Sequence, residues 1–108
     1  MLLNNNKIYS MLGLATKAGK VVSGEFSTEK AVKEGKAYLV MVSEEASDNT
    51  KKSFANTCSY YHIDMRIYGT KEELGHAIGK EFRASVAILD EGFSKQIMKH
   101  IDSQYMEV

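Results

Sequence analysis

The residues best suited to bind a ligand gather around the segment from Val21 to Val32. Lys20 and Lys30 place a cation on each side of Gly24, and an amphipathic helical pattern follows. The free N–H groups at the start of a helix attract anions, and glycine allows a ligand to approach the backbone closely. We expect Ser23 to cap this helix with its hydroxyl. The pattern alone is compatible with an anion-binding helix start or with an ordinary capped surface helix.

A second group of such residues is Lys80-Glu81-Phe82-Arg83, which is predicted to be a loop with an aromatic ring between charged side chains. Ammonium groups and amides bind phosphates, hydroxyls and carboxyls bind base edges, and an aromatic ring or a guanidinium stacks on an unpaired base. The two segments together therefore have the chemistry of an RNA site. The candidate RNA-binding residues are Lys20, Gly24, Glu25, Phe26, Ser27, Lys30, Lys33, Lys80, Phe82 and Arg83.

No residue set in the sequence points to a reaction. The histidines stand on separate predicted elements without metal-ligand spacing, namely His62, His76 and His100. Gly19-Lys20 is followed by a valine, so it does not complete a phosphate-binding P-loop. Glu44-Glu45 can in principle hold Mg²⁺, but a solvated acidic turn that caps the third helix is favoured. We therefore predict a protein that is not an enzyme, with no catalytic residues, no metal and no cofactor.

Length and composition set the class of protein. A chain of 108 residues is expected to form one domain, residues 1–108, with a core large enough to be stable without disulfides. Its single cysteine, Cys58, excludes an intrachain disulfide and is expected to be an inert core residue. The sequence has no run of about 18 apolar residues and no signal-peptide pattern. We predict a cytoplasmic protein that does not associate with membranes.

Charge is unevenly distributed along the chain. The formal net charge is zero, which by itself disfavours nucleic-acid binding. Residues 1–40, however, contain six lysines and three glutamates, an excess of three positive charges. A patch of that size can contact a few phosphates but cannot wrap a long duplex.

Hydrophobic periodicity predicts helices and strands in strict alternation. The helices are expected at 4–18, 24–34, from the turn at 44–49 to residue 61, at 71–78, and from the turn at 90–92 onward, and the strands at 20–23, 37–43, 63–68 and 84–89. Residues 37–43 and 84–89 are apolar on both alternating faces, as in central strands covered on both sides. This order predicts an α/β fold, a single-domain three-layer α/β/α sandwich with a four-stranded mixed sheet.

The sequence also predicts which side chains of several helices are buried and which cap the helix ends. The spacing of Phe54, Cys58 and Tyr61 predicts the buried stripe of the third helix, and Thr70 with Glu73 forms a capping-box pattern. The second helix is expected to bury Phe26, or Ala31 and Val32. The asparagines at 4–6 are expected to cap the first helix, and residues 103–108 are expected to fray.

Many short motifs occur in an order that is familiar from one protein family. They are LGLA at 12–15, KAGKVVSGE at 17–25, KAYLV at 36–40, AS and NT at 46–47 and 49–50, CSYY at 58–61, ELGHAIGK at 73–80 and DEGF at 90–93. Over nearly its whole length the chain resembles the archaeal kink-turn-binding ribosomal protein superfamily, of the L7Ae and L30e type, and most closely its small bacterial YlxQ-like members. The resemblance implies the α/β/α sandwich and a non-enzymatic protein that clamps a sharply bent RNA helix with tandem sheared G·A pairs.

The RNA motif of that family maps onto the second predicted helix. It consists of a glycine followed by Asn-Glu and, three residues after the glutamate, a lysine. Gly24 and Lys30 match it, whereas Phe26 stands at the asparagine position and Ser27 at the glutamate position. The two groups that read G·A base edges are therefore absent. Serine still donates and accepts a hydrogen bond, and phenylalanine packs or stacks.

The resemblance also assigns roles to the loop at 80–83. Phe82 would cover a flipped-out nucleotide, and Arg83 would bind a phosphate. The first hypothesis is a non-enzymatic RNA-binding protein of the ribosomal-protein type that recognises structured, kink-turn-like RNA. The alternative is a protein-interaction module of the translation machinery with a decayed RNA site. The implied partners are ribosomal or kink-turn RNA and ribosomal proteins, with the chain itself a monomer.

Overall fold

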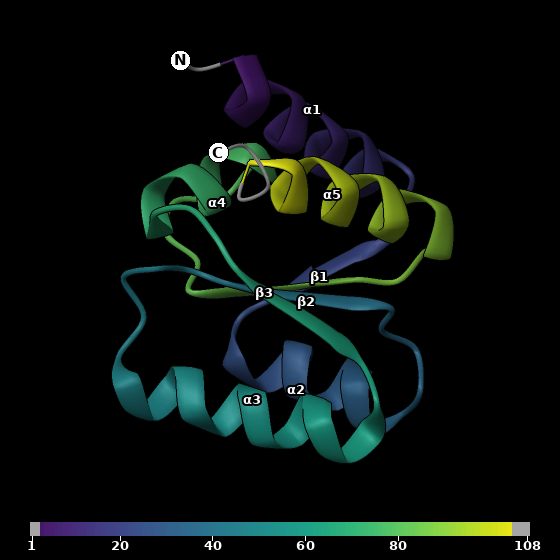
Figure 1. Cartoon of the computed structure of the whole chain (residues 1–108), viewed down its shortest axis with the longest axis vertical. Coiled ribbons are helices and arrows are strands. Elements are labelled where there is room, and N and C mark those ends of the chain that lie inside the picture. Colours follow the sequence, from purple (N-terminus) through teal and green to yellow (C-terminus); the bar gives the residue numbers. More distant parts are fainter. Residues whose placement is uncertain (1–2, 105–108) are drawn as a thin grey trace.

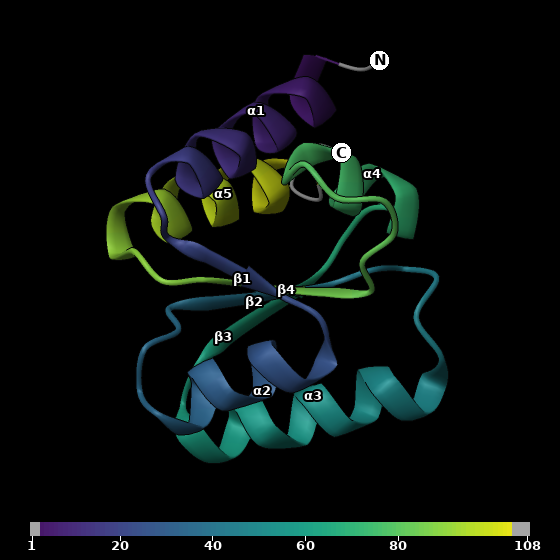
Figure 2. The same cartoon turned by 180° about the vertical axis from the view of Figure 1, so that it is seen from behind.

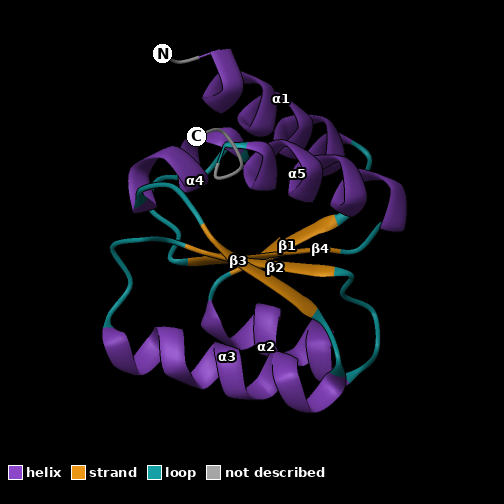
Figure 3. Ribbon diagram, viewed as in Figure 1, coloured by secondary structure: helices purple, strands orange, loops and turns teal. Residues whose placement is uncertain are grey.

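The protein folds as a three-layer α/β/α sandwich, seen in a computed structural model that describes residues 3–104, with side chains from residue 7 onward (Figure 1). The elements are, in chain order, α1 (Leu3–Lys17), β1 (Val21–Ser23), α2 (Glu25–Lys33), β2 (Leu39–Val42), α3 (Asp48–Tyr61), β3 (Asp64–Ile67), α4 (Lys71–Ala77), β4 (Ser85–Ile88) and α5 (Glu91–Ser103). Helices α1, α4 and α5 cover one face of the sheet, and α2 and α3 cover the other (Figure 3). The predicted fold class is confirmed.

The four strands form a mixed sheet in the order β1-β4-β2-β3. β2 and β3 are parallel, while β4 pairs antiparallel to both β1 and β2. β2 and β4 are therefore the central strands, as their unbroken apolar runs predict, and every residue in both is buried. Among the described strands, β1 is an edge strand that pairs only with β4.

Alternate residues of the central strands supply two separate cores. Leu39 and Met41 pack with α1, α4 and α5. Val40 and Val42 face the other way and pack with Ala31, Val32 and the α3 residues Phe54 and Cys58. Cys58 is buried, and burial raises the pKa of its thiol to about 11, so the thiol is protonated at neutral pH.

The sequence leaves open whether the second helix buries Phe26 or Ala31 and Val32. Ala31 and Val32 are buried and Phe26 is 76% exposed, so the second alternative is confirmed. Two other predicted side-chain positions are wrong. Tyr61, the last residue of α3, is 38% exposed, whereas Phe54 and Cys58 of the same predicted stripe are buried. Ala18, the last residue of the helix predicted at 4–18, is exposed and follows α1, which ends at Lys17.

The predicted chain ends are only partly described. Ser103 was expected to fray but is the last residue of α5, while residues 105–108 lie outside the described residues. The predicted caps at 4–6 lie outside the described side chains. Among the described residues no helix is long and apolar enough to cross a membrane.

Helix starts differ in how they are capped. The capping box of Thr70 and Glu73 is confirmed, and Ser47 and Asp90 cap α3 and α5. The prediction that Glu44-Glu45 caps α3 is wrong, since Glu45 Oε1 accepts a hydrogen bond of 2.9 Å from the backbone N–H of Lys71 at the start of α4. Only α2, among the described helices with an assigned N-cap, lacks a side-chain cap.

Candidate nucleic-acid interface

The two segments singled out in the sequence meet at one end of the sheet. β1 pairs antiparallel with β4, so the end of β1 lies beside the start of β4, and the Gly24 N–H donates to the Ser85 carbonyl at 3.0 Å. The 80–83 loop leads directly into β4, which brings it to the start of α2 (Figure 2). Arg83 Nε donates a hydrogen bond of 3.0 Å to Ser23 Oγ.

This bond corrects the role predicted for Ser23. Its hydroxyl does not cap α2, because Ser23 is the last residue of β1 and its oxygen accepts from Arg83. Gly24 is the N-cap, with φ 94° and ψ 158°, a backbone region that is essentially restricted to glycine. With no side-chain cap, the first-turn N–H groups of α2 are available to an anion. Glu25, which is exposed, is the first residue of the helix.

The lysines of α2 differ in their freedom to bind phosphate. Lys33 Nζ lies 3.1 Å from a carboxylate oxygen of Glu29, one helical turn earlier. Lys30 is exposed and forms no ion pair with any residue that the structure describes. A paired ammonium must give up or share its partner to meet an anion, so the ammonium of Lys30 is the freer of the two.

A groove runs between α2 and the edge strand β1, and we call it the α2–β1 groove. Its volume is about 260 Å³. The residues that line it are Val22, Phe26, Ser27, Lys30, Ala31, Glu34, Lys36 and Leu89. Its walls combine an aromatic ring and two ammonium groups with an apolar surface. The sequence analysis did not select Lys36.

Lys20 does not lie at the start of α2, as the sequence suggested. Its carbonyl accepts a hydrogen bond of 2.8 Å from the N–H of Leu89, beyond the end of β4. Lys20 therefore lies at the opposite end of β1 from Gly24, beside the groove residue Leu89. The two cations predicted to flank the helix start are separated by the length of the strand.

The 80–83 loop is held against α4. The N–H of Lys80 donates to the carbonyl of Gly75 at 2.7 Å, and the N–H of Arg83 donates to that of Lys71 at 3.0 Å. A Cβ on Gly75 would lie 2.2 Å from the Glu81 carbonyl oxygen, so only glycine allows this backbone contact. The sequence does not single out Gly75, because a glycine within a helix gives no local signal that a loop distant from it packs against its backbone.

The loop presents an aromatic ring and a guanidinium to solvent. Phe82 is 62% exposed. Arg83 Nη1 donates to the Phe82 carbonyl at 2.8 Å, so two of the five guanidinium N–H groups are engaged inside the protein. The remaining donors can reach a phosphate, and Phe82 can cover a base.

The helix that supports the loop is itself fastened to α1. Tyr9 OH donates to Glu73 Oε1 at 2.8 Å, and Glu73 also belongs to the capping box of α4. This hydrogen bond, together with those from Thr70, lowers the pKa of Glu73. Burial, with the nearby Glu73 carboxylate, raises the pKa of Tyr9.

Residues 3–104 contain no cluster of three His, Cys, Asp or Glu side chains that could hold a metal ion. The chemical groups that the predicted site residues offer are hydrogen-bond donors and acceptors, charges and aromatic rings. Apart from Lys33, which ends α2 and pairs with Glu29, these residues lie either at the start of α2 with the 80–83 loop or along the α2–β1 groove.

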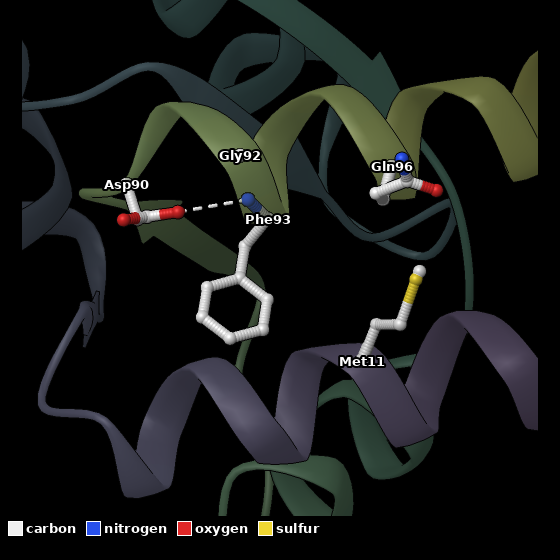
Figure 4. A pocket seen from close by; sticks show the side chains of 5 residues that line it. All are labelled: Met11, Asp90, Gly92, Phe93 and Gln96. Carbon is white, nitrogen blue, oxygen red and sulfur yellow. Dashed lines mark hydrogen bonds between the residues drawn. The ribbon is translucent and has the colours of Figure 1, made fainter.

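A second groove lies in the other helical layer, between α1 and α5 (Figure 4). Met11 of α1 faces Phe93 and Gln96 of α5 across it. Its one charged lining residue, Asp90, accepts a hydrogen bond of 2.8 Å from the Phe93 N–H and so serves as the cap of α5. With no cation among the residues that line it, this groove does not suit a nucleic acid.

The fold is a three-layer α/β/α sandwich in which an uncapped helix start, a guanidinium and the exposed ring of Phe82 lie at one end of the sheet. Residues 6–98 match the model of the Ribosomal protein L7Ae/L30e/S12e/Gadd45 family. The chain belongs to this family.

Relatives cover nearly the whole chain. It is 39% identical over 94 residues to the RNA-binding protein YlxQ of Bacillus subtilis, covering 87% of this chain and 94% of that protein. It is 42% identical over 93 residues to the large ribosomal subunit protein eL30 of Neurospora crassa, covering 81% and 82%. The resemblance noted in the sequence, including its YlxQ-like subgroup, is confirmed.

Solved structures agree with the fold. A protein of unknown function from Bacillus halodurans superposes with a TM-score of 0.86 at 38% identity, covering 89% of this chain and 97% of that one. The Giardia lamblia 15.5kD RNA binding protein superposes with a TM-score of 0.76 at 16% identity, covering 93% and 86%. The second match, at this low identity, concerns the fold alone.

Proposed function

We propose that this protein is a non-enzymatic RNA-binding protein that recognises structured RNA through the start of α2 and the 80–83 loop. Two kinds of observation support the proposal. Relatives at 39% and 42% identity are named as an RNA-binding protein and a ribosomal protein. The candidate site residues bring together the chemical groups that bind RNA backbones and unpaired bases. Its proposed setting is the translation machinery of the cytoplasm, where it acts as a single-domain monomer.

The hydrogen bond between Arg83 and Ser23 carries the proposal. It holds the 80–83 loop beside the uncapped start of α2, so that a guanidinium and free backbone N–H groups lie on one surface. Backbone donors at a helix start bind phosphate without any change of conformation. Such a surface can contact the phosphate backbone of a bent RNA on two sides.

We further propose that the RNA is kink-turn-like. Gly24 and Lys30 keep their places in the family motif, and Lys30 has no competing carboxylate within the described part of the chain. Ser27 retains one hydroxyl for a base edge in place of a glutamate. This arrangement favours recognition by backbone shape and phosphates over the reading of G·A edges.

The test is a binding titration of the purified protein against a kink-turn RNA and against the same RNA with its G·A pairs replaced, at two salt concentrations. A clear preference for the intact kink-turn supports the whole proposal. Equal binding to both RNAs with a steep salt dependence leaves a general phosphate clamp and refutes kink-turn recognition. Absence of binding to either RNA refutes the RNA-binding function.

A second candidate function is a protein-interaction module that contacts ribosomal proteins. The exposed ring of Phe26, where the family motif has an asparagine, favours it, because exposed aromatic residues are common in protein interfaces. The test is a pull-down from nuclease-treated lysate. A stable ribosomal-protein partner that survives nuclease supports this function, and loss of every partner refutes it.

A further inference from the structure

The α2–β1 groove is lined by residues of α2, by Val22 of β1 and by Leu89 after β4. Phe26 and Ser27 line it near the helix start, and Lys36 and Leu89 line it toward the other end of β1. Lys20 adjoins that end through the hydrogen bond between its carbonyl and the Leu89 N–H. The groove thus begins at the proposed RNA surface and leads away from it toward further cations.

The groove combines the surfaces that a nucleobase with its phosphate requires. Val22, Ala31 and Leu89 provide an apolar lining, and Phe26 provides an aromatic ring that is 76% exposed. The Ser27 hydroxyl can bond to a base edge. Stacking on an aromatic ring together with a nearby cation is how proteins hold unpaired bases of any identity.

Charge within the groove favours an anionic occupant. Two ammonium groups line it, from Lys30 and Lys36, against one carboxylate, from Glu34. Lys36 Nζ lies 3.4 Å from a Glu34 carboxylate oxygen, so that carboxylate is neutralised by its neighbour. Lys30 is left as the uncompensated charge, in position to meet a phosphate.

The size of the groove sets the size of the occupant. Its volume of about 260 Å³ falls below the range of roughly 300–1,000 Å³ that is typical of complete small-molecule sites. It therefore suits one ring system that enters as part of a larger molecule. An unpaired nucleotide of an RNA already bound at the start of α2 meets that condition.

We infer that the α2–β1 groove holds one unpaired nucleobase of the bound RNA, stacked on Phe26, with Lys30 on an adjacent phosphate. This inference rests on the proposed RNA-binding function and extends it, since it assigns a role to Phe26 at the position where the family motif has an asparagine. It also names the feature of the RNA that the protein prefers, a single-stranded nucleotide next to the structured part.

The first test compares a kink-turn RNA that carries a three-nucleotide single-stranded extension with the same RNA without it. The wild-type protein is expected to bind the extended RNA at least about fivefold more tightly, which is the smallest effect typical of one stacked base. Phe26→Ala is expected to bring this ratio close to one. Tyr60→Ala is the matched control, because Tyr60 is 77% exposed on α3 and does not line the groove, and it should keep the ratio.

A second test observes the stacked base directly. The chain contains no tryptophan, so Phe26→Trp introduces a single indole whose fluorescence reports on its surroundings. Stacking of a base should quench this emission with the extended RNA and much less with the blunt one. Tyr60→Trp should respond equally to both RNAs.

The outcomes separate the two proposals. If the wild-type protein binds both RNAs with equal affinity, or if Phe26→Ala retains the preference, or if the Phe26→Trp emission does not respond to the extension, the groove inference is refuted while RNA binding stands. If the wild-type protein binds neither RNA, the proposed function fails and the groove inference fails with it.

Discussion

Arg83 Nε lies 3.0 Å from Ser23 Oγ, across 60 residues of sequence, and donates a hydrogen bond to it. The bond joins the loop that precedes β4 to the last residue of β1. Because Gly24 and α2 follow Ser23 directly, the loop and the helix start keep a defined relative position. The 80–83 loop and the start of α2, neither of which indicates an RNA site by itself, thereby form one surface.

The Ser23 hydroxyl is predicted to act as a positioning group for RNA binding. Ser23→Ala should weaken RNA binding severalfold and lower the free energy of unfolding by about 1 kcal/mol, since it removes one partly buried hydrogen bond. The measurements are RNA titration and chemical denaturation. Ser23→Thr, which keeps the hydroxyl, should restore both values. Wild-type affinity in the alanine variant would show that the bond does not organise the surface.

Gly75 is predicted to set the position of the 80–83 loop. Gly75→Ala would force its Cβ against the Glu81 backbone at 2.2 Å, so the loop must shift. We expect a loss of stability of about 1–3 kcal/mol and a clear loss of RNA affinity. Gly79→Ala is the control, because an added Cβ at Gly79 (φ 79°) would strain the backbone while touching nothing within 4 Å. It should lower stability and leave RNA affinity nearly intact, and equal losses of affinity in both variants would contradict this role.

Lys30 is predicted to contribute one phosphate contact. Lys30→Ala should weaken binding to all RNAs and reduce the slope of log affinity against log salt by about one. Lys33→Ala serves as the comparison, because Glu29 already pairs with that ammonium at 3.1 Å. Its effect on the slope should be smaller. A slope that is unchanged in Lys30→Ala would show that Lys30 does not contact a phosphate of the RNA.

The bond between Tyr9 and Glu73 is predicted to make stability depend on pH in the acid range. Since the Tyr9 hydrogen bond lowers the pKa of Glu73 in the folded protein, the stabilisation is complete above the unfolded pKa, near 4.5, and is lost as pH falls through the lower folded value. Tyr9→Phe should lower the free energy of unfolding by about 0.5–1.5 kcal/mol at pH 7.

The difference between wild type and Tyr9→Phe should shrink as pH falls through the lowered pKa of Glu73, where the carboxylate becomes protonated. Denaturation curves at pH 7 and pH 3 measure it. Glu73→Gln should be less stable than wild type at pH 7 and should show a weaker acid dependence. A pH-independent difference between wild type and Tyr9→Phe would mean that the carboxylate charge does not contribute.

The layered architecture follows from local patterns in the sequence. The runs at 37–43 and 84–89 have no polar face, so they require cover on both sides, and the alternation with helices supplies it. The capping box at Thr70 is equally local, because its two partners stand three residues apart. Phe26 shows the limit, since periodicity does not decide which of two apolar faces of a short helix meets the core.

The sequence by itself determined the fold class, the family and the chemical types in the candidate site, because periodicity, turn residues and motif order are properties of neighbouring residues. Only the tertiary structure decided which of those residues meet. In the folded chain Arg83 contacts Ser23, and Lys20 lies at the opposite end of β1 from Gly24. Lys36 is among the residues that line the groove. The alternation of residues along a strand sets which side chains face the core, but the pairing of strands that are distant in sequence, in the order β1-β4-β2-β3, arises from packing the whole core.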